Sequence, residues 1–242
     1  MTPAPPFVEQ MGGDAKRSYV RQMFTAIAPR YDLLNHVLSL NVDRLWRRRA
    51  VHALRWRDAP AGSYLDLCAG TLELAAELER QPDFRGRVLG ADFVVPMLRL
   101  GRAKGRRVLS VGADALELPF PDQSFEGCMV GFGVRNLADL DRGLGEMTRV
   151  LKRGGRVVIL EISTPSTWPL RPLYRFYFRR VLPLIGRLLS KHTTAYSYLP
   201  ESVEQFPGPQ EMAERMRRSG FANVEYQSLS FGIATLYRGV RA

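Results

Sequence analysis

Short apolar runs alternate with helical patterns through the middle of the chain. A helix is predicted over 139–152, where Leu140, Leu144, Met147 and Leu151 recur every three to four residues and Gly154–Gly155 supplies a stop. A second helix is predicted around 209–219. The runs that are typical of buried strands lie at 63–68, 87–92, 107–114, 125–132 and 156–162, with two later strands near 222–230 and 233–240. This pattern predicts an α/β fold: a Rossmann-like, doubly wound, mostly parallel seven-stranded sheet with helices on both faces.

Two segments fall outside this alternation. Residues 14–58 have a helical and strongly basic pattern, and we expect residues 1–58 to form an N-terminal helical cap on a main domain at 59–242. Residues 165–208 are rich in proline and aromatic residues, which predicts a helical insertion after the fifth strand.

The stretch "SYLDLCAGTLELA" (63–75) has the outline of a nucleotide-binding turn: an apolar strand, a small-residue loop and a helix. A dinucleotide loop needs three glycines, because its pyrophosphate must approach backbone amides closely. Here only Gly70 is present, and Leu72 and Leu74 occupy the other two positions. With Leu72 in the loop, close approach of a diphosphate is not expected.

S-adenosylmethionine carries no phosphate and does not impose that requirement. It needs a tight turn after the first strand, which Gly70 provides, and carboxylates for its ammonium group and its ribose. Asp66, Asp92 and Asp114 end three successive strands and are suited to the ammonium, the ribose hydroxyls and the adenine amino group respectively. Any one of them alone is more often a helix cap or turn former, but the set of three points to a ligand. The predicted cofactor contacts are Asp66, Gly70, Thr71 (also a helix-capping hydroxyl), Asp92, Asp114, Ala115 and Gly131.

The net charge of the 242-residue chain is +11, which favours an anionic partner such as nucleic acid, lipid or an acidic substrate. The excess is nearly all arginine, so a base-composition bias of the genome is an equally good explanation. Cys68 and Cys128 lie in apolar runs and are interpreted as reduced core residues, and no metal site is predicted. No apolar stretch reaches membrane-spanning length and the start lacks the features of a signal peptide, so a cytoplasmic location is expected.

Five stretches that together span almost the whole chain carry a resemblance to the ubiquinone/menaquinone biosynthesis C-methyltransferase family, within the class I S-adenosylmethionine-dependent methyltransferases. They are "FTAIAPRYDLLNHVLSLNVDRLWR" (24–47), "LDLCAGT" (65–71), "DALELPFPDQSFEGCMVGFGVRN" (114–136), "RVLKRGGRVVILEIS" (149–163), and the C-terminal region with "YSYLPESVEQFP" and "GFANVEYQSLSFGIATLYRG". The sequence departs from the family where it has Asn41 for glycine, Asp43 for histidine, Arg153 for proline and Leu72 for a second loop glycine. We expect the first three to be tolerated surface or turn changes, whereas Leu72 bears on the loop geometry.

The resemblance implies methyl transfer from S-adenosylmethionine to a ring carbon of a polyprenylated hydroquinone, with demethylmenaquinol as the first candidate. The absence of an organelle presequence favours a bacterial enzyme and hence menaquinone. A benzoquinol of ubiquinone biosynthesis is the alternative, and a nucleic-acid methyltransferase or a non-catalytic binding protein is less favoured. No nucleic-acid partner is predicted, and a homo-oligomer is left open.

A ring carbon becomes a good nucleophile only when the neighbouring phenol loses its proton. Arg135, Asn136 and Tyr31 are the predicted catalytic residues, because the first two follow the fourth strand and Tyr31 could fold over from the N-terminal segment. A structural ion pair with Glu161 is the alternative for Arg135, and His36 could lie near the site. Residues 166–192 carry six basic residues and no acidic one, among aromatic side chains. This composition predicts peripheral contact with the anionic inner face of the cell membrane, a lid over the site, or both.

Overall fold

The computed structural model describes residues 13–105, 107–165 and 194–242, together with Pro172, Tyr174, Phe176 and Arg180. Most of the predicted insertion, including most of the basic and aromatic stretch 166–192, lies outside the described residues. The helices are α1 (Gly13–Ile27), α2 (Tyr31–Leu38), α3 (Val42–Ala53), α4 (Glu73–Glu79), α5 (Val95–Gly101), α6 (Leu140–Val150), α9 (Thr194–Gln205) and α10 (Pro209–Arg218). The strands are β1 (Ser63–Leu67), β2 (Arg87–Asp92), β3 (Leu109–Gly112), β4 (Phe125–Gly131), β5 (Leu151–Ile162), β6 (Phe221–Leu229) and β7 (Ala234–Arg241).

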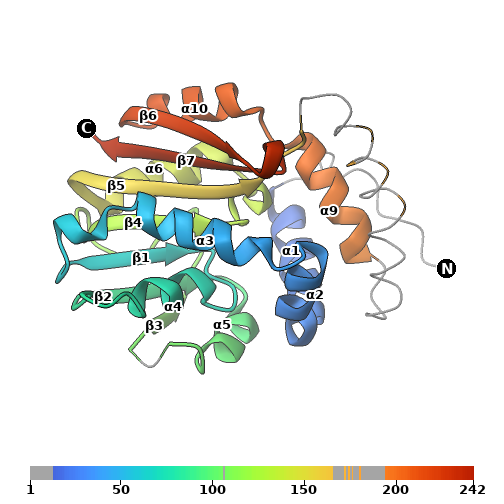
Figure 1. The fold of residues 1–242 in the computed structure, drawn as a ribbon, viewed down its shortest axis with the longest axis horizontal. Coiled ribbons are helices and arrows are strands. Elements are labelled where there is room, and N and C mark those ends of the chain that lie inside the picture. Colours follow the sequence, from blue (N-terminus) through green and yellow to red (C-terminus); the bar gives the residue numbers. More distant parts are fainter. Residues whose placement is uncertain are drawn as a thin grey trace.

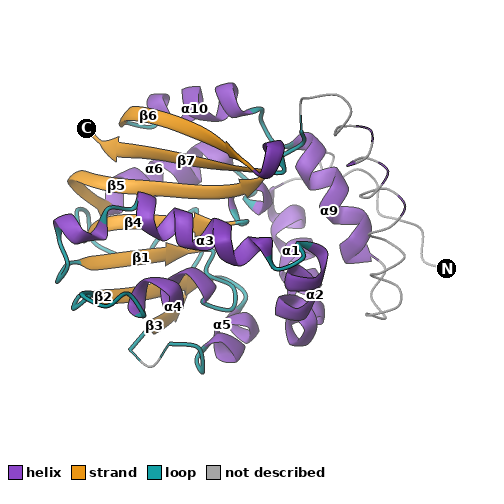
Figure 2. Ribbon diagram, in the orientation of Figure 1, coloured by secondary structure: helices purple, strands orange, loops and turns teal. Residues whose placement is uncertain are grey.

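The strands form one seven-stranded sheet in the order β3-β2-β1-β4-β5-β7-β6 (Figures 1 and 2). The first five strands are parallel, and β7 runs antiparallel to both β5 and β6. After β1 the chain first builds outward through β2 and β3 and then returns to pair β4 with the other edge of β1. The order therefore reverses between β1 and β4, which is where ligands bind in such sheets. The predicted doubly wound, mostly parallel sheet is confirmed.

Successive side chains of the central strands enter two different cores. Cys128 and Val130 of β4 pack with α6 and α10, whereas Met129 between them packs with α3 and α4 on the other face. This alternation follows from the two-residue period of a strand, and it explains why both faces need apolar residues. The core that Met129 enters also contains Trp46 and Val51 of α3 and Leu54 just after this helix. Helix α3 is therefore part of the layer that covers the sheet. The predicted domain boundary at residue 58 stays a prediction.

Helix α6 ends earlier than the sequence predicts. It stops at Val150 and β5 begins at Leu151, so Gly154 and Gly155 lie inside the strand and do not terminate the helix. The reason is strand pairing: Leu151 has an extended backbone and pairs with Phe125 of β4.

Helix α1 packs over the carboxyl ends of the strands through a third apolar cluster. Val20 and Phe24 of α1 contact Val94 and Met97 after β2, and Tyr198 of α9 joins them. Figure 1 shows α1, α2 and α9 at the same end of the sheet. These helices cover the crevice at the point where the strand order reverses.

Candidate active site

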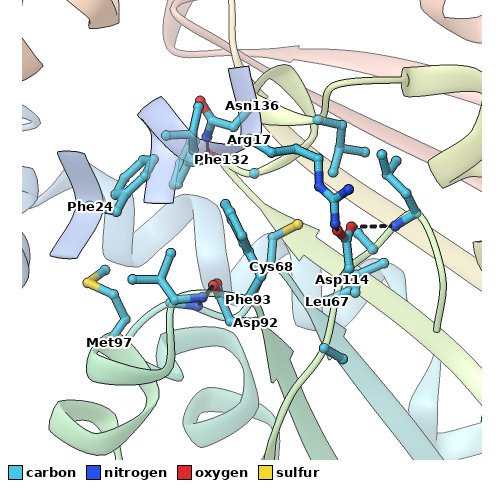
Figure 3. A pocket seen from close by; sticks show the side chains of 18 of the residues that line it. Arg17, Phe24, Leu67, Cys68, Asp92, Phe93, Met97, Asp114, Phe132 and Asn136 are labelled. Carbon is cyan, nitrogen blue, oxygen red and sulfur yellow. Dashed lines mark hydrogen bonds and ion pairs between the residues drawn. The ribbon is translucent and has the colours of Figure 1, made fainter. Parts of the chain in front are cut away.

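A cavity lies at the carboxyl ends of β1, β2 and β4, below helix α1. Its floor includes residues from the β1 loop, from the end of β2 and from the loops after β3 and β4, while α1 and Tyr31 of α2 close it from above. Figure 3 shows Phe24 and Met97 on one side and the facing pair Arg17 and Asp114 on the other. The predicted residues that line this cavity are Tyr31, Gly70, Asp92, Asp114, Ala115, Gly131 and Asn136.

The loop after β1 turns sharply because Cys68, Gly70 and Leu72 all adopt positive φ angles, of 53°, 52° and 63°. Glycine suits such a backbone, whereas a leucine there is strained. The amide of Gly70 donates a hydrogen bond of 2.8 Å to Oδ2 of Asp92. Asp92 thereby ties the loop to the end of β2, and the turn predicted at Gly70 is present.

Leu72 does not obstruct the loop, contrary to the steric argument made from the sequence. Its side chain is fully buried in the core between α3, α4 and β2. Two glycines make room for it: a Cβ on Gly90 would lie 2.2 Å from Leu72 Cδ2, and one on Gly101 would lie 2.9 Å from Leu72 Cγ. The larger residue is therefore accommodated on the core side, and the cavity side of the loop stays open.

Thr71 does not cap helix α4, which corrects the sequence prediction. The helix begins at Glu73, after Leu72, and has no side-chain cap. The Thr71 hydroxyl instead donates a hydrogen bond of 2.5 Å to Oδ1 of Asp32 in α2. Lys104 links the Asp32 carboxylate to Glu73, so this partly exposed network joins α2 to the cofactor loop. Thr71 does not line the cavity.

Asp66 is almost completely buried and does not line the cavity either. Its Oδ2 accepts a hydrogen bond of 2.9 Å from the amide of Ala75 in α4, whereas its Oδ1 has no hydrogen-bond partner among the described residues. Burial raises its pKa to about 8, against the opposing effects of the Ala75 amide and of Arg47. A buried carboxyl group with a spare acceptor atom is suited to receive a cationic group in the neighbouring crevice, because the cation would stabilise its ionised form.

Asp92 lines the cavity at the end of β2. Its two oxygens accept hydrogen bonds from the amides of Gly70 and Val94, at 2.8 and 2.7 Å. Burial raises its pKa to about 6, and these two hydrogen bonds oppose the rise. Each carboxylate oxygen has more than one lone pair, so Asp92 keeps acceptor capacity for ligand hydroxyls.

Asp114 follows β3, and its carboxylate is engaged on both oxygens. Oδ1 accepts a hydrogen bond of 2.9 Å from the amide of Leu116, and Oδ2 forms an ion pair with Arg17 of α1 (Figure 3). Arg17 was not singled out from the sequence. Its position in α1, one helical turn before Val20 and two turns before Phe24, is the pattern that places all three on the face over the cavity.

Arg135 lies behind the cavity wall and forms a buried ion pair with Glu161, with 2.6 Å between Nη1 and Oε1. The same Nη1 donates to the carbonyl of Phe132 at 2.6 Å, and the Arg135 Nε has no hydrogen-bond partner among the described residues. Burial tends to lower the pKa of Arg135, but Glu161 outweighs it and the pKa is raised. The structural pair that the sequence left open is therefore formed, and the catalytic role of Arg135 stays a prediction.

Tyr31 and Asn136 line the cavity next to this pair. Burial raises the pKa of the Tyr31 hydroxyl, while its hydrogen bond with Asn35 and the charges of Arg135 and Arg47 act in the opposite direction. Asn136 accepts a hydrogen bond of 2.9 Å from the hydroxyl of Tyr198 in α9. The sequence reasoning missed Tyr198, although it lies in the C-terminal stretch that carries the family resemblance.

Asp43 is buried, so it is not the surface or turn change that the sequence suggested. Its carboxylate accepts a 2.6 Å hydrogen bond from the Ser39 hydroxyl, lies 3.0 Å from Nδ1 of His36 and 3.4 Å from Nη2 of Arg47. Burial alone would raise its pKa, but these three partners outweigh it and lower the pKa. The Arg47 guanidinium stacks 5.2 Å from the ring centre of Phe132, a cavity residue. Asn41 has a φ of 62°, which explains why a turn that favours glycine tolerates asparagine.

The sheet order, the loop with Gly70 and the strand-end acids define a class I S-adenosylmethionine-dependent methyltransferase. The residues present are chemically compatible with this cofactor: Asp92 lines the crevice and keeps acceptor capacity, and Asp66, buried outside the lining, keeps one acceptor atom without a hydrogen-bond partner among the described residues. Residues 12–241 match the model of the ubiE/COQ5 methyltransferase family, and the chain belongs to that family.

Two relatives illustrate how closely the chain matches other family members. It is 49% identical to the demethylmenaquinone methyltransferase of Thermus thermophilus, over 90% of this chain and 100% of that protein. It is 45% identical to the ubiquinone/menaquinone biosynthesis C-methyltransferase of Geobacter sulfurreducens, over 93% of this chain and 89% of that protein. A solved S-adenosylmethionine-dependent methyltransferase of Thermotoga maritima shares the fold, with a TM-score of 0.64, 19% identity and coverage of 91% of this chain and 99% of that one.

Proposed function

We propose that the protein methylates a ring carbon of a polyprenylated hydroquinone and that demethylmenaquinol is its substrate. The observation that carries the proposal is the crevice itself, in which strand-end carboxylates stand beside a wall that contains Tyr31 and Asn136. The names of the relatives at 45–49% identity support the ring as the methyl acceptor. A benzoquinol is the second candidate, because the Geobacter relative is named for both quinones.

The cofactor supplies an activated sulfonium methyl group. Asp92 would accept hydrogen bonds from its ribose hydroxyls, and Asp66 would balance its ammonium group. Asp114 would accept from the adenine amino group once the Arg17 contact opens or shifts. Gly70, Ala115 and Gly131 would contact it through the backbone, whereas Thr71 would act indirectly by holding the loop to Asp32.

Reaction begins when the phenol oxygen beside the reactive carbon gives up its proton, which places electron density on that carbon. The cofactor would supply its methyl group to that carbon, whose electron pair forms the new carbon–carbon bond, and the methyl–sulfur bonding pair would stay on the sulfur of the leaving S-adenosylhomocysteine. Loss of the ring proton would restore the aromatic ring as a phenolate, and its oxygen would take up one proton to give the methylated hydroquinone. Tyr31 and Asn136 would hold the substrate hydroxyl, and the buried charge of Arg135 would stabilise the phenolate from behind them.

The isoprenoid tail of such a substrate resides in a membrane. No helix within the described ranges is long and apolar enough to cross one. Because the tail of the proposed substrate lies in lipid, we propose peripheral association with the anionic inner face of the cell membrane. The stretch 166–192, which the sequence predicts to make this contact, lies largely outside the described residues.

Methyl transfer from labelled S-adenosylmethionine to short-tailed demethylmenaquinol and demethylbenzoquinol tests the proposal. We expect a product that carries the labelled methyl group with the naphthoquinol and a lower rate with the benzoquinol. Tyr31→Phe and Asn136→Ala should each lower kcat about 10–100-fold while S-adenosylhomocysteine binds normally. Glu225→Gln, in an exposed pair with Arg238, is the control. Binding of the cofactor without transfer to either quinol would contradict the assignment.

A further inference from the structure

The corner between α2 and α3 exposes a group of large apolar side chains. Leu33 and Val37 are 55% and 40% exposed and lie four residues apart, hence on one face of α2. Leu40, in the turn that follows, is 83% exposed, and Leu45 of α3 is 49% exposed. The other large apolar side chains exposed among the described residues lie at least five positions apart in the sequence: Leu100, Leu109, Phe176, Tyr226 and Phe231. We call Leu33, Val37, Leu40 and Leu45 the corner patch.

The corner patch is held on a rigid support. The buried carboxylate of Asp43 in α3 contacts His36 of α2 and Ser39, the residue just after α2. The amide of Asn41 donates a hydrogen bond of 2.8 Å to the carbonyl of His36. These bonds fix the angle between the helices. Leu40 has a φ of 52°, a backbone that glycine or asparagine adopts at lower cost, and the residue stays mostly exposed. An exposed apolar group on a rigid corner marks an interaction surface.

The surface beside the corner patch is strongly basic. Arg44, Arg48 and Arg49 are exposed on α3, and Asp43, the only acidic residue from 33 to 57, is buried. The neighbouring carboxylate is Glu77 of α4, 3.7 Å from Arg48. Farther along α3 a hollow continues the positive surface, lined by Arg48, Arg49, His52, Arg57, Arg80 and Arg238 with Glu77. Apolar side chains rimmed by arginines are complementary to an anionic lipid surface, in which acyl chains lie beneath negative headgroups.

The corner patch also lies next to the proposed active site. Tyr31, in the first turn of α2, lines the cavity and bonds to Asn35, so the 31/35 face of the helix points inward. Leu33 and Val37 lie on the outward face of the same helix. One helix, about 10 Å across, therefore separates the exposed patch from the cavity.

We propose that the α2–α3 corner is the surface by which this protein docks on an anionic bilayer, with the corner patch in the acyl boundary and the arginines among the headgroups. The inference rests on the proposed function, since a substrate with an isoprenoid tail must be collected from lipid. A second copy of the chain fits less well, because a symmetric contact would place the arginine rim against itself. Nucleic acid would match the arginines but not the leucines.

Vesicle binding of the full chain tests the docking surface without any turnover. The double variant Leu33→Ser/Leu40→Ser should bind vesicles containing phosphatidylglycerol at least tenfold more weakly than the unmodified protein. The matched control Leu100→Ser/Leu109→Ser, which changes leucines 48% and 59% exposed elsewhere, should bind as the unmodified protein does. Arg44→Gln/Arg48→Gln should remove most of the dependence on phosphatidylglycerol and on salt. If the double serine variant folds poorly, Leu40→Gly takes its place in the vesicle assay, because the positive φ of residue 40 suits glycine.

A polarity-sensitive dye placed by Leu40→Cys should shift to the blue when vesicles are added, whereas the same dye at Arg218→Cys on α10 should not. Cys128 is buried and burial raises the pKa of Cys68 far above its usual value, so the introduced exposed thiol reacts first. If the emission of the dye on Leu40→Cys is already blue-shifted before vesicles are added, another part of the chain or a second copy covers the patch. That result would overturn the proposal. Equal vesicle binding by the patch variant and the control variant would also overturn the proposal.

Activity separates this inference from the proposed function. The Leu33→Ser/Leu40→Ser variant should methylate a tail-free, water-soluble quinol at the unmodified rate and lose activity only toward a long-tailed quinol in vesicles. Vesicle binding at the corner with no methyl transfer to any quinol would leave the docking surface standing and remove the proposed function. Methyl transfer to a quinol, together with unchanged vesicle binding by the patch variants, would leave the proposed function standing and overturn the docking surface.

Discussion

Glu161 of β5 holds the guanidinium of Arg135 at 2.6 Å, and both side chains are almost completely buried. The pair connects the segment after β4, which carries Asn136, to the neighbouring strand. The charge of Arg135 also acts on the Tyr31 hydroxyl, where it lowers the pKa against the larger rise caused by burial. The two residues thus set both the position and the electrostatics of the proposed substrate side of the cavity.

Glu161→Gln should lower the free energy of unfolding by about 3 kcal/mol, because it leaves the Arg135 charge buried without its partner. Urea denaturation measures this change. Glu225→Gln breaks an exposed pair and should cost about 0.5 kcal/mol or less. Equal costs for the two variants would show that the buried pair contributes no more than a surface one.

Asp66→Asn should become progressively more stable than the unmodified protein between pH 5 and pH 8 in the absence of cofactor. The pKa of Asp66 is raised to about 8 by burial, while in the unfolded chain it is about 4, so across this window the native state holds more protons. The native protein then loses stability as the pH rises, and asparagine removes that loss while keeping an acceptor for Ala75. Denaturation curves at both pH values test this. An equal pH dependence of stability in Asp66→Asn and in the unmodified protein would contradict the prediction.

Leu72 and Gly90 should be energetically coupled. Gly90→Ala alone places a methyl group 2.2 Å from Leu72 Cδ2 and should cost about 1–3 kcal/mol. Leu72→Ala removes a fully buried side chain and should cost about 2–5 kcal/mol. In the double variant the new methyl group enters the vacated space, so the combined cost should fall more than about 1 kcal/mol below the sum. Simple additivity in a denaturation cycle would show that the two residues do not share this space.

Asp43→His, the change toward the residue that the family favours, should destabilise this protein. It removes the carboxylate that pairs with His36, Ser39 and Arg47 and leaves Arg47 buried without a counter-charge. We expect a loss of about 3 kcal/mol in unfolding free energy. Exchanging the partners through His36→Asp/Asp43→His should recover part of it, because one acid and one imidazole again face each other. Thermal unfolding of the single and double variants measures these changes in stability. If the double variant is no more stable than Asp43→His, Arg47 requires the acid on α3.

The strands and the cavity-lining acids were predictable because both depend on local order along the chain. Buried parallel strands need continuous apolar runs, and their carboxyl ends meet at one edge of the sheet, so Asp92 and Asp114 at successive run ends had to come together. The tight turn at Gly70 is likewise a property of its neighbours in sequence. The end of α6 was predicted less well, because pairing of Leu151 with Phe125 competes with helix formation and pairing is not local.

The sequence by itself determined the doubly wound sheet, the place of the cofactor loop and the family, since these follow from periodicity and from contiguous motifs. Only the tertiary structure decided where Leu72 points, which partner Thr71 takes, that Asp43 is buried, and that Arg17 lies over Asp114. The physical reason is the same in each case: these side chains meet partners on elements far away in the chain, and the space available for them is set by packing.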